Sequence, residues 1–489
     1  MQRASEPRSL KTIRMRVLTN AFWLSVCRFG SDALSFVLFA AIGRAFGPVG
    51  TGEYSYAFAI SSVLVLLCSG GFEEYGTRQY ARASEAERPR LWRELFSAQI
   101  VRLGVMLTLF AVFLGIAARG EFGARVSIVI ELVVFLVGWG LARVLFTPAM
   151  GLQVMVRPAF TELGCRVAAI IVALALWLMA VPSLPLMLIG FPLSSLVLLW
   201  LAVRNAASHG AHLPPVRMAG VWQMTRETFP FAAADVLNQF YARADMLLIA
   251  YLMSRADVGL YATDVKFVEV GLLPLVLLGT AAYPLLSRYA AVDKKDFTDA
   301  AHDLVRTTFL FSGWLAVGLC TVVPLLIVPI FGPAFEPAAA HLPWFAALAL
   351  TKGGEIAMFR LLYSVQLQGA YVLSLVAGTV LIVILNFVLI SSFGIQGAVV
   401  AGICSVGMVA ALCAWRLRQH IALGTVFSVL ARLAVTLAVT AGLFFAGERA
   451  GLSPWLNAVG ACALFPLVAF GAGLVLNPAS SRLFKAQLP

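Results

Sequence analysis

Residues 229–290 read FPFAAADVLNQFYARADMLLIAYLMSRADVGLYATDVKFVEVGLLPLVLLGTAAYPLLSRYA. The stretch contains two apolar runs, 229–253 and 257–286, and each is long enough to cross a hydrocarbon layer about 30 Å thick as a helix. The second run nevertheless places Asp264, Lys266 and Glu269 close together. Because a charge inside a bilayer is costly, the stretch predicts a membrane protein whose internal charges have a definite role.

The whole chain continues this pattern. Its 489 residues are 61% hydrophobic and only 12% charged, with a mean hydropathy of +0.90, which is too little charge for the surface of a soluble protein. Apolar runs of membrane-spanning length recur about fourteen times. We place them at 18–42, 51–72, 95–117, 126–148, 159–180, 186–204, 229–253, 257–286, 304–330, 340–366, 370–391, 396–415, 425–446 and 454–476.

The positive charges indicate the orientation of these helices. When alternate connections are assigned to opposite sides, most loop Lys and Arg fall on the side that also holds the basic tail, residues 1–17. The exceptions are Arg44, Arg119, Arg125, Arg255 and Arg449. The pattern predicts cytoplasmic termini and explains the net charge of +12 without nucleic acid. The first apolar run lacks a cleavage site, so we predict a retained helix rather than a signal peptide.

The connections are short, which argues against an enzyme. The longest, residues 73–94, has charges at helical spacing and predicts an amphipathic helix on the cytoplasmic surface. No phosphate-binding loop or nucleophile motif is present in the sequence. The seven cysteines lie in or beside apolar runs without a CxxC pair, and the histidines are scattered, so we expect neither a metal site nor a cofactor.

A weak internal repeat is visible. FGPVGTGEYSYAF (46–58) is similar to SRADVGLYATDVKF (254–267), and FTPAMGLQVMVRPAF (146–160) is similar to LLYSVQLQGAYVLSL (361–375). The repeat predicts two similar six-helix bundles, 18–204 and 229–418, around a central cavity. They would be joined by a cytoplasmic linker, 205–228, and followed by two more helices and a tail in 419–489. Duplicated halves around a central site are a transporter pattern.

Four segments carry a family resemblance. They are NAFWLSVCRFGSDALSFVLFAAIGRAFGPVGTGEYSYAFA (20–59), the stretch 229–290, IVPIFGPAFEPAA (327–339) and FGIQGAVVAGICS (393–405). In this order, and over nearly the whole chain, they resemble the Wzx-type oligosaccharide flippases of the multidrug/oligosaccharidyl-lipid/polysaccharide exporter superfamily.

The resemblance implies a function. Such a protein moves undecaprenyl-pyrophosphate-linked oligosaccharide from the cytoplasmic to the periplasmic leaflet of a bacterial inner membrane, for O-antigen, capsule or exopolysaccharide assembly. Its partners would be the lipid-linked oligosaccharide, the bilayer, and polysaccharide polymerase and assembly proteins.

Ten Lys and Arg lie inside the predicted helices. Five of them, Arg102, Arg143, Arg306, Arg360 and Arg432, are near the cytoplasmic ends, where long side chains can reach the interface. The others lie deeper or beside an acid, as Arg28 does with Asp32 and Arg166 does with Glu162. Such pairs either fix helix packing or line a hydrated cavity.

We favour the cavity for four of the deep cations. A pyrophosphate cannot cross hydrocarbon unless cationic groups replace its water. The candidate substrate-binding residues are therefore Arg28, Arg243, Lys266 and Lys352. Related peptidoglycan lipid flippases use arginines on the first and eighth helices, the positions of Arg28 and Lys266 here. A lysine offers a monodentate contact in place of a bidentate one.

Acidic residues accompany these cations. Asp32, Asp245, Asp264, Glu269 and Glu355 are candidates for binding H⁺ or Na⁺ or for pairing with the cations. The sequence leaves open whether an ion or the membrane potential drives transport. For Asp264 we expect either a partner on a neighbouring helix or a position wet enough to need none.

Helix breakers suggest bending. Pro230, Pro274, Pro284 and Pro324, with Gly271 and Gly279, lie in the predicted helices seven to nine, where bends would let two lobes rock. The alternative is ordinary tolerance of these residues in membrane helices.

Three other functions stay open. A cation-coupled drug exporter of the same superfamily would need an acid-lined cavity. A membrane glycosyltransferase or polymerase would need a catalytic loop. A scaffold for polysaccharide assembly would need neither.

Overall fold

The computed structural model describes residues 10–117, 126–152, 154–180 and 183–474, and these are helical without a strand. The expected tail at 1–17 and the tail after 476 lie outside the residues whose side chains are described. The prediction of an all-α membrane protein is confirmed.

The chain forms two compact units. The described part of unit 1 comprises residues up to Ala41 and Ala57–Gln239, and that of unit 2 comprises Ile42–Tyr56 and the residues from Phe240 onward. Helices α1 (Leu10–Ser69) and α8 (Val221–Leu252) contribute to both units. The division into bundles 18–204 and 229–418 stays a prediction.

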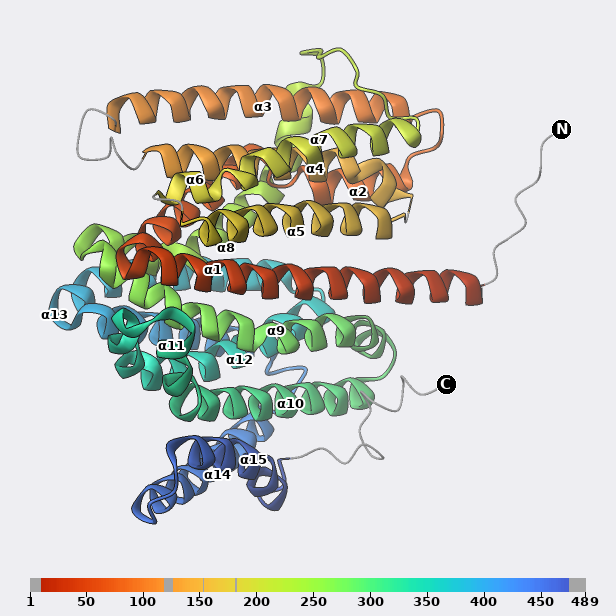
Figure 1. Ribbon diagram of the computed structural model, residues 1–489. Helices are drawn as coiled ribbons and strands as arrows, with labels where there is room; N and C mark the ends of the chain where they lie inside the picture. Colours follow the sequence, from red (N-terminus) through yellow and green to blue (C-terminus); the bar gives the residue numbers. More distant parts are fainter. Residues whose placement is uncertain (1–9, 118–125, 153, 181–182, 475–489) are drawn as a thin grey trace. The chain divides into compact units, whose positions relative to one another are not determined.

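Each unit has its own helices (Figure 1). Those of unit 1 are α2 (Phe72–Arg82), α3 (Arg88–Ala117), α4 (Val126–Gly151), α5 (Val156–Leu178), α6 (Leu184–Leu188) and α7 (Gly190–Ser208). Those of unit 2 are α9 (Arg255–Val292), α10 (Lys294–Thr321), α11 (Val323–Phe331), the 3₁₀ helix η1 (Pro333–His341), α12 (Leu342–Ser364), α13 (Gln368–Leu417), α14 (Leu423–Arg449) and α15 (Pro454–Gly471).

The expected fourteen crossings are compatible with these helices. Ten segments of the described chain are long and apolar enough to cross a membrane, and α8 and α12 are not among them. Two of the ten contain a break where glycine adopts a positive φ, at Gly47 (63°) and Gly394 (58°). A positive φ is cheap only for glycine, so each break ends one helix and starts the next within a short turn.

Two predicted helices are divided. The span 304–330 breaks after Thr321, and α11 begins with Pro324 in its first turn. The amphipathic segment 73–94 also breaks, because Ser84 and Glu87 form a cap that starts α3: the Ser84 hydroxyl donates to the Glu87 carboxylate at 2.7 Å and the Ser84 N–H at 2.9 Å.

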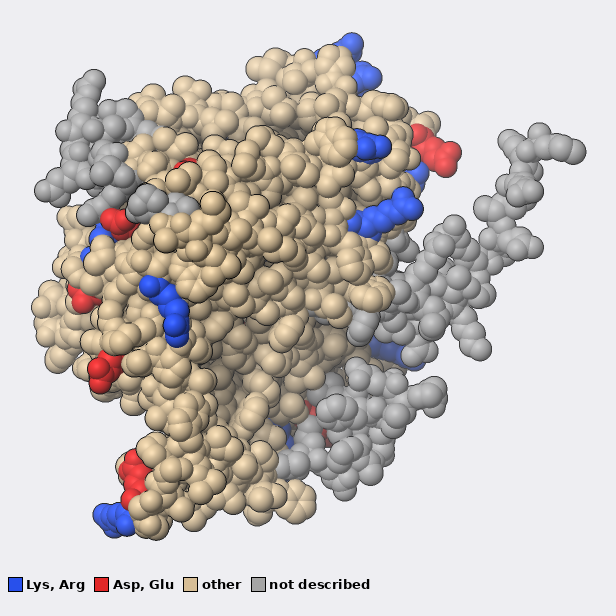
Figure 2. Space-filling view, in the orientation of Figure 1, with Lys and Arg blue, Asp and Glu red and all other residues tan. Residues whose placement is uncertain are grey.

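The surface agrees with a lipid environment. On the face shown in Figure 2 the described atoms belong almost entirely to uncharged residues, with a few isolated charged side chains. Large apolar side chains are exposed on the helices, including Leu178, Tyr251 and Phe470, each more than 70% exposed. In water such a surface would aggregate.

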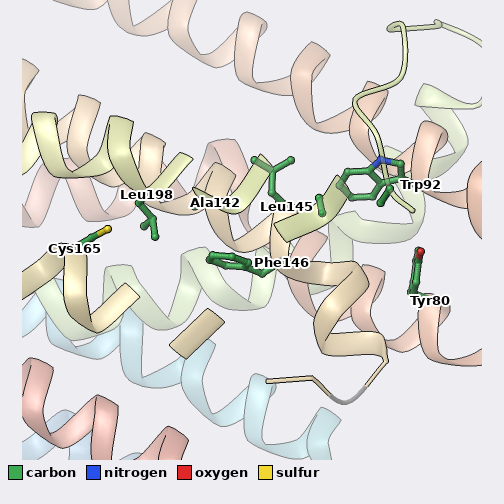
Figure 3. Packing of buried hydrophobic residues seen from close by; sticks show 10 residues of the cluster. Tyr80, Trp92, Ala142, Leu145, Phe146, Cys165 and Leu198 are labelled. Atoms are coloured by element: carbon green, nitrogen blue, oxygen red, sulfur yellow. The ribbon is translucent and has the colours of Figure 1, made fainter. Parts of the chain in front are cut away.

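Unit 1 has a core of small and aromatic side chains. Helix α7 packs against α4 and α5, and the three lie side by side in Figure 1. Ala142, Phe146, Leu198 and Ala202 are fully buried at this contact (Figure 3). Small residues let the helix backbones approach closely, which is how membrane helices gain packing energy.

In unit 2, the central helix α12 packs against α9, α10 and α13, while α14 and α15 pack on each other and on α10. The first pair of repeated segments also meets here. A Cβ added at Gly52 would overlap the carbonyl oxygen of Arg255, and one added at Gly259 would overlap that of Pro48. The contact is reciprocal, because each glycine faces the residue four positions before the other.

The prolines of α8 and α9 do not break their helices. Pro230 lies within α8, and α9 runs through Pro274 and Pro284. Gly271 has the Leu315 side chain against it, and Gly279 has that of Arg360. These glycines therefore allow close packing of α9. Of the expected helix breakers, Pro324 does lie at a break, because α11 begins there. The breaks at Gly47 and Gly394 lie between predicted spans.

Several arginines expected to reach the interface bind helix ends. Arg102 donates to the carbonyls of Leu67 (2.9 Å) and Gly70 (2.7 Å) at the end of α1. Arg306 donates to the Leu474 carbonyl after α15, at 2.6 Å, and Arg432 to that of Gly473, at 3.2 Å. The last carbonyls of a helix lack internal partners, so these guanidinium groups satisfy them.

Candidate functional site

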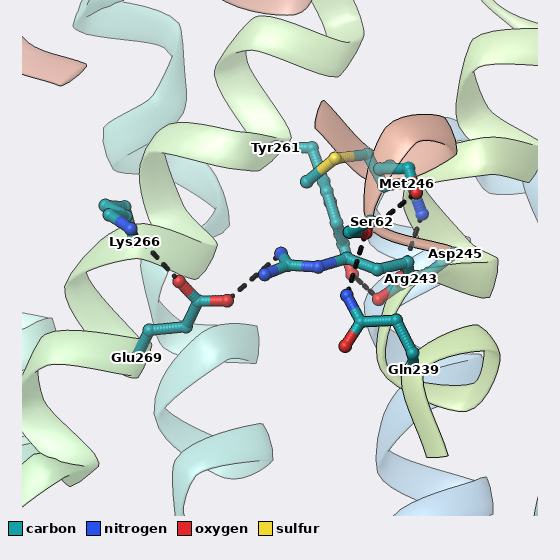
Figure 4. Close-up of polar contacts among 9 residues, drawn as sticks. Ser62, Gln239, Arg243, Asp245, Met246, Tyr261, Lys266 and Glu269 are labelled. Carbon is teal, nitrogen blue, oxygen red and sulfur yellow. Dashed lines mark hydrogen bonds and ion pairs between the residues drawn. The ribbon is translucent and has the colours of Figure 1, made fainter. Parts of the chain in front are cut away.

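The candidate site in unit 2 is built on one carboxylate. Glu269 of α9 lies 3.1 Å from the Arg243 guanidinium of α8 and 3.4 Å from the Lys266 ammonium one turn earlier on α9. Figure 4 shows the two cations approaching its two oxygens from opposite sides. The cross-helix pair Arg243–Glu269 was not predicted, because sequence spacing reveals only partners on the same helix.

A second polar pair lies next to these charges. The Tyr261 hydroxyl donates to the Asp245 carboxylate, which also accepts the Met246 N–H at 2.8 Å. Tyr261 is one of the largest fully buried side chains described. The pair connects α8 to α9, so it fixes the part of α8 that carries Arg243.

A cavity of about 140 Å³ brings these groups together. Its lining includes Asp245, Tyr261, Glu269 and Lys352. The structure thus assembles Arg243, Lys266 and Lys352 of the predicted substrate-binding set with two of the predicted acids. This cavity is smaller than the roughly 300–1,000 Å³ of ligand pockets.

The other predicted residues of unit 2 lie apart from this cavity. Asp264 is fully buried, with a carboxylate oxygen 3.6 Å from His341 Nδ1 of η1. It therefore has a partner on a neighbouring element, the first of the two expected alternatives. Glu355 is buried on α12, and no ion pair within 4.0 Å joins it to Lys352.

The remaining candidates belong to unit 1. The Arg28 side chain lies outside the described residues, and Asp32 lines a cavity of about 470 Å³. The same cavity contains Arg143, whose guanidinium lies 3.6 Å from both Glu73 and Glu162. Sequence reasoning missed this cluster, because Glu73 was assigned to a surface helix and Arg143 to the interface.

The structure offers no evident metal site in its described part, where no group of three or more His, Cys, Asp or Glu could hold an ion. All seven cysteines are free, and four are buried among helices. The polar clusters of both units therefore consist of paired carboxylates and cationic groups, which bind ligands through charge and hydrogen bonds.

Comparison with known families decides the class of this chain. The model of a family described as polysaccharide biosynthesis protein matches residues 17–290, more than half of the sequence. The chain belongs to the polysaccharide biosynthesis protein family. The match includes Arg243, Lys266 and Glu269 of the unit 2 site, while Lys352 lies beyond it.

One curated relative is a "probable low-salt glycan biosynthesis flippase", Agl15 of Haloferax volcanii, 23% identical over 225 residues. The match covers 45% of this chain and 48% of that protein, so the chain spans about half of the relative's length.

Two solved structures share the fold. The lipid II flippase MurJ, in an inward closed conformation, has a TM-score of 0.74 at 13% identity, covering 92% of this chain and 99% of its own. An inward-facing multidrug resistance MATE transporter has a TM-score of 0.63 at 10% identity, covering 79% and 94%. The resemblance to the exporter superfamily is thereby confirmed.

Proposed function

We propose that this protein is a flippase for undecaprenyl-pyrophosphate-linked oligosaccharide, moving it from the cytoplasmic to the periplasmic leaflet by alternating access. The observation that carries the proposal is the set of cations beside one small cavity in an apolar helical unit. Lys352 lines the cavity, and Arg243 and Lys266 pair with Glu269 in its wall. A pyrophosphate is the kind of group that such cations bind, and a lipid-linked headgroup is what a family of this kind would carry.

Glu269 would take part by exchange. Its carboxylate pairs with both Arg243 and Lys266, whose side chains are 18% and 23% exposed. An entering phosphate would replace the carboxylate as the partner of both cations. Glu269 thus offsets part of the positive charge until a phosphate takes its place, which suits a cycle between two states.

The lipid part of the substrate would have a separate place. An almost wholly apolar cavity of about 320 Å³ lies between α10 and α15, lined by Thr307, Leu310, Phe311, Trp314, Phe465 and Pro466. A polyprenyl tail has no polar group to satisfy, so an apolar groove on the C-terminal helices is a suitable contact for it.

The location follows from the loop charges. We propose a bacterial inner membrane with both termini in the cytoplasm, where the basic connections lie. A cysteine placed at the N-terminus should react with a membrane-impermeant thiol reagent only after the membrane is opened. Labelling in intact cells would show that the N-terminus lies outside the cytoplasm, which is opposite to the proposed orientation.

A drug exporter is the second candidate. The unit 1 cavities are lined by more carboxylates than cationic groups among the described side chains, and the fold is also that of a MATE transporter. An organic cation would suit such a lining. An organic cation would not explain the pairing of Arg243 and Lys266 with Glu269 beside Lys352 in unit 2.

The cellular test uses single substitutions. Arg243→Ala and Lys266→Ala should each reduce surface polysaccharide at normal protein levels, while Lys295→Ala, which removes an exposed lysine at the start of α10, should not. An unchanged amount of surface polysaccharide in both Arg243→Ala and Lys266→Ala would show that these two residues do not bind the substrate.

A further inference from the structure

Unit 1 contains a polar site of its own. Two cavities, of about 470 and 380 Å³, share Glu73, Trp139, Arg143 and Arg166 in their linings. Both volumes fall in the range of small-molecule sites. The shared residues make them two chambers of one site, formed by five helices: α1, α2, α4, α5 and α8.

Both arginines of this site already have partners among its neighbouring side chains. Arg143 lies between Glu73 and Glu162, at 3.6 Å from each. Arg166 donates to the Ser31 hydroxyl, and its guanidinium lies 5.6 Å from the Trp139 ring centroid. The described lining has five carboxylates and two guanidinium groups: Asp32, Glu73, Glu74, Glu162 and Asp235 against Arg143 and Arg166. A phosphate would meet net repulsion here, whereas in unit 2 the cations Arg243, Lys266 and Lys352 outnumber the carboxylates Asp245 and Glu269.

Hydroxyl groups fit this lining better than either kind of ion. Carboxylates accept hydrogen bonds, guanidinium groups donate them, and the amides of Asn238 and Gln239 do both. A sugar hydroxyl is both donor and acceptor, so it can bind between members of a carboxylate–guanidinium pair without separating their charges. Such charge-assisted hydrogen bonds are stronger than those between neutral groups.

Trp139 adds an apolar surface to the same site. Its indole is partly exposed, lines both chambers and is held from behind by Phe135, with the ring centroids 5.3 Å apart. Trp139 and Arg143 are one turn apart on α4, so the ring and the guanidinium share a face. The negative face of an aromatic ring attracts the C–H face of a sugar, which a hydrated anion does not offer.

We propose that the unit 1 site binds the sugar portion of the substrate, and that it selects uncharged or amino sugars over acidic ones. The inference rests on the proposed function and divides the headgroup between the units by chemistry. Unit 2 takes the pyrophosphate, whereas the site around Trp139 and Arg143 takes the glycan.

The test separates the two contributions with two probes. Affinities of the purified protein are measured for undecaprenyl pyrophosphate, which has no sugar, and for the lipid-linked oligosaccharide extracted from the source cells. In Trp139→Phe the ratio of the two affinities should fall about three- to tenfold, because a smaller ring loses stacking area. Affinity for undecaprenyl pyrophosphate itself should not change, which also shows that the variant is folded.

Lys266→Gln is the matched variant in the other unit. It should weaken both probes equally and leave their ratio unchanged. An unaltered ratio in Trp139→Phe would overturn the sugar site while leaving the flippase proposal intact. If neither probe binds the wild type, the flippase proposal itself fails. A third outcome is that Trp139→Phe weakens the binding of ethidium and leaves the ratio of the two lipid affinities unaltered. The site would then be one for organic cations.

Discussion

Glu269 is the shared ion-pair partner of two cations of unit 2. It lies within 3.4 Å of both Arg243 and Lys266, and its own side chain is 38% exposed. At this residue scale the proposed function has the protein's own carboxylate and the substrate's phosphate competing for the same partners. Removing the carboxylate should therefore favour the ligand.

Glu269→Gln should raise the affinity for undecaprenyl pyrophosphate about fivefold, which corresponds to about 1 kcal/mol for a partly exposed pair. Binding to purified protein measures this. Asp264→Asn is the control, because Asp264 lies on the same helix but pairs with His341. Equal affinity in wild type and Glu269→Gln would show that Glu269 does not compete with substrate.

At the scale of elements, the crossing of the repeated segments depends on two glycines. Gly52→Ala and Gly259→Ala should each lower the melting temperature, because the added Cβ overlaps a backbone carbonyl that no side-chain rotation can move. One alanine already moves the two segments apart, so the second alanine should lower the melting temperature by less. The double variant should therefore lose less than the sum of the two single losses.

Gly407→Ala is the matched control, since this helical glycine of α13 has open space where a Cβ would be. Its melting temperature should stay the same or rise. Additive losses at Gly52 and Gly259 would mean that the two contacts are independent.

The end of α15 provides another element-scale prediction. Arg306→Leu removes the donor to the Leu474 carbonyl and leaves a buried acceptor unsatisfied, at a cost of about 1–3 kcal/mol. Hydrogen exchange near the end of α15 should become faster. Arg416→Leu, which removes an exposed arginine stacked on Trp415, should leave it unchanged. Equal exchange in both variants would show that Arg306 does not hold this helix end.

The helices could be predicted from the sequence because hydropathy and length determine them locally. The spans 126–148 and 257–286 fall within α4 and α9, and 454–476 begins where α15 begins. Pro324 was recognised as a helix breaker, although the span 304–330 was not divided there. The break at Ser84 was missed, since it depends on a capping pair inside an otherwise helical pattern.

Only the part of the site that depends on local sequence spacing could be predicted. Pairs on one helix, such as Lys266 with Glu269, follow from spacing, and this one is confirmed. Pairs between helices, such as Arg243 with Glu269 or Arg143 with Glu73, depend on helix rotation and packing. A single sequence does not determine these quantities.

At the scale of the whole molecule, each unit offers a polar cavity inside an apolar exterior. The two proposals assign a phosphate to the cations beside the unit 2 cavity and sugar hydroxyls to the unit 1 cavities. The apolar groove between α10 and α15 is assigned to a long apolar tail. A small organic cation would use only the carboxylates of unit 1.

Transport in proteoliposomes tests this account most directly. The purified protein is reconstituted with lipid-linked oligosaccharide, and the fraction reaching the opposite leaflet is measured, with ethidium transport followed in parallel. We predict translocation above protein-free liposomes, its loss in the triple variant Arg243→Gln, Lys266→Gln, Lys352→Gln, and no transport of ethidium. Ethidium transport without movement of the lipid-linked oligosaccharide would contradict the account.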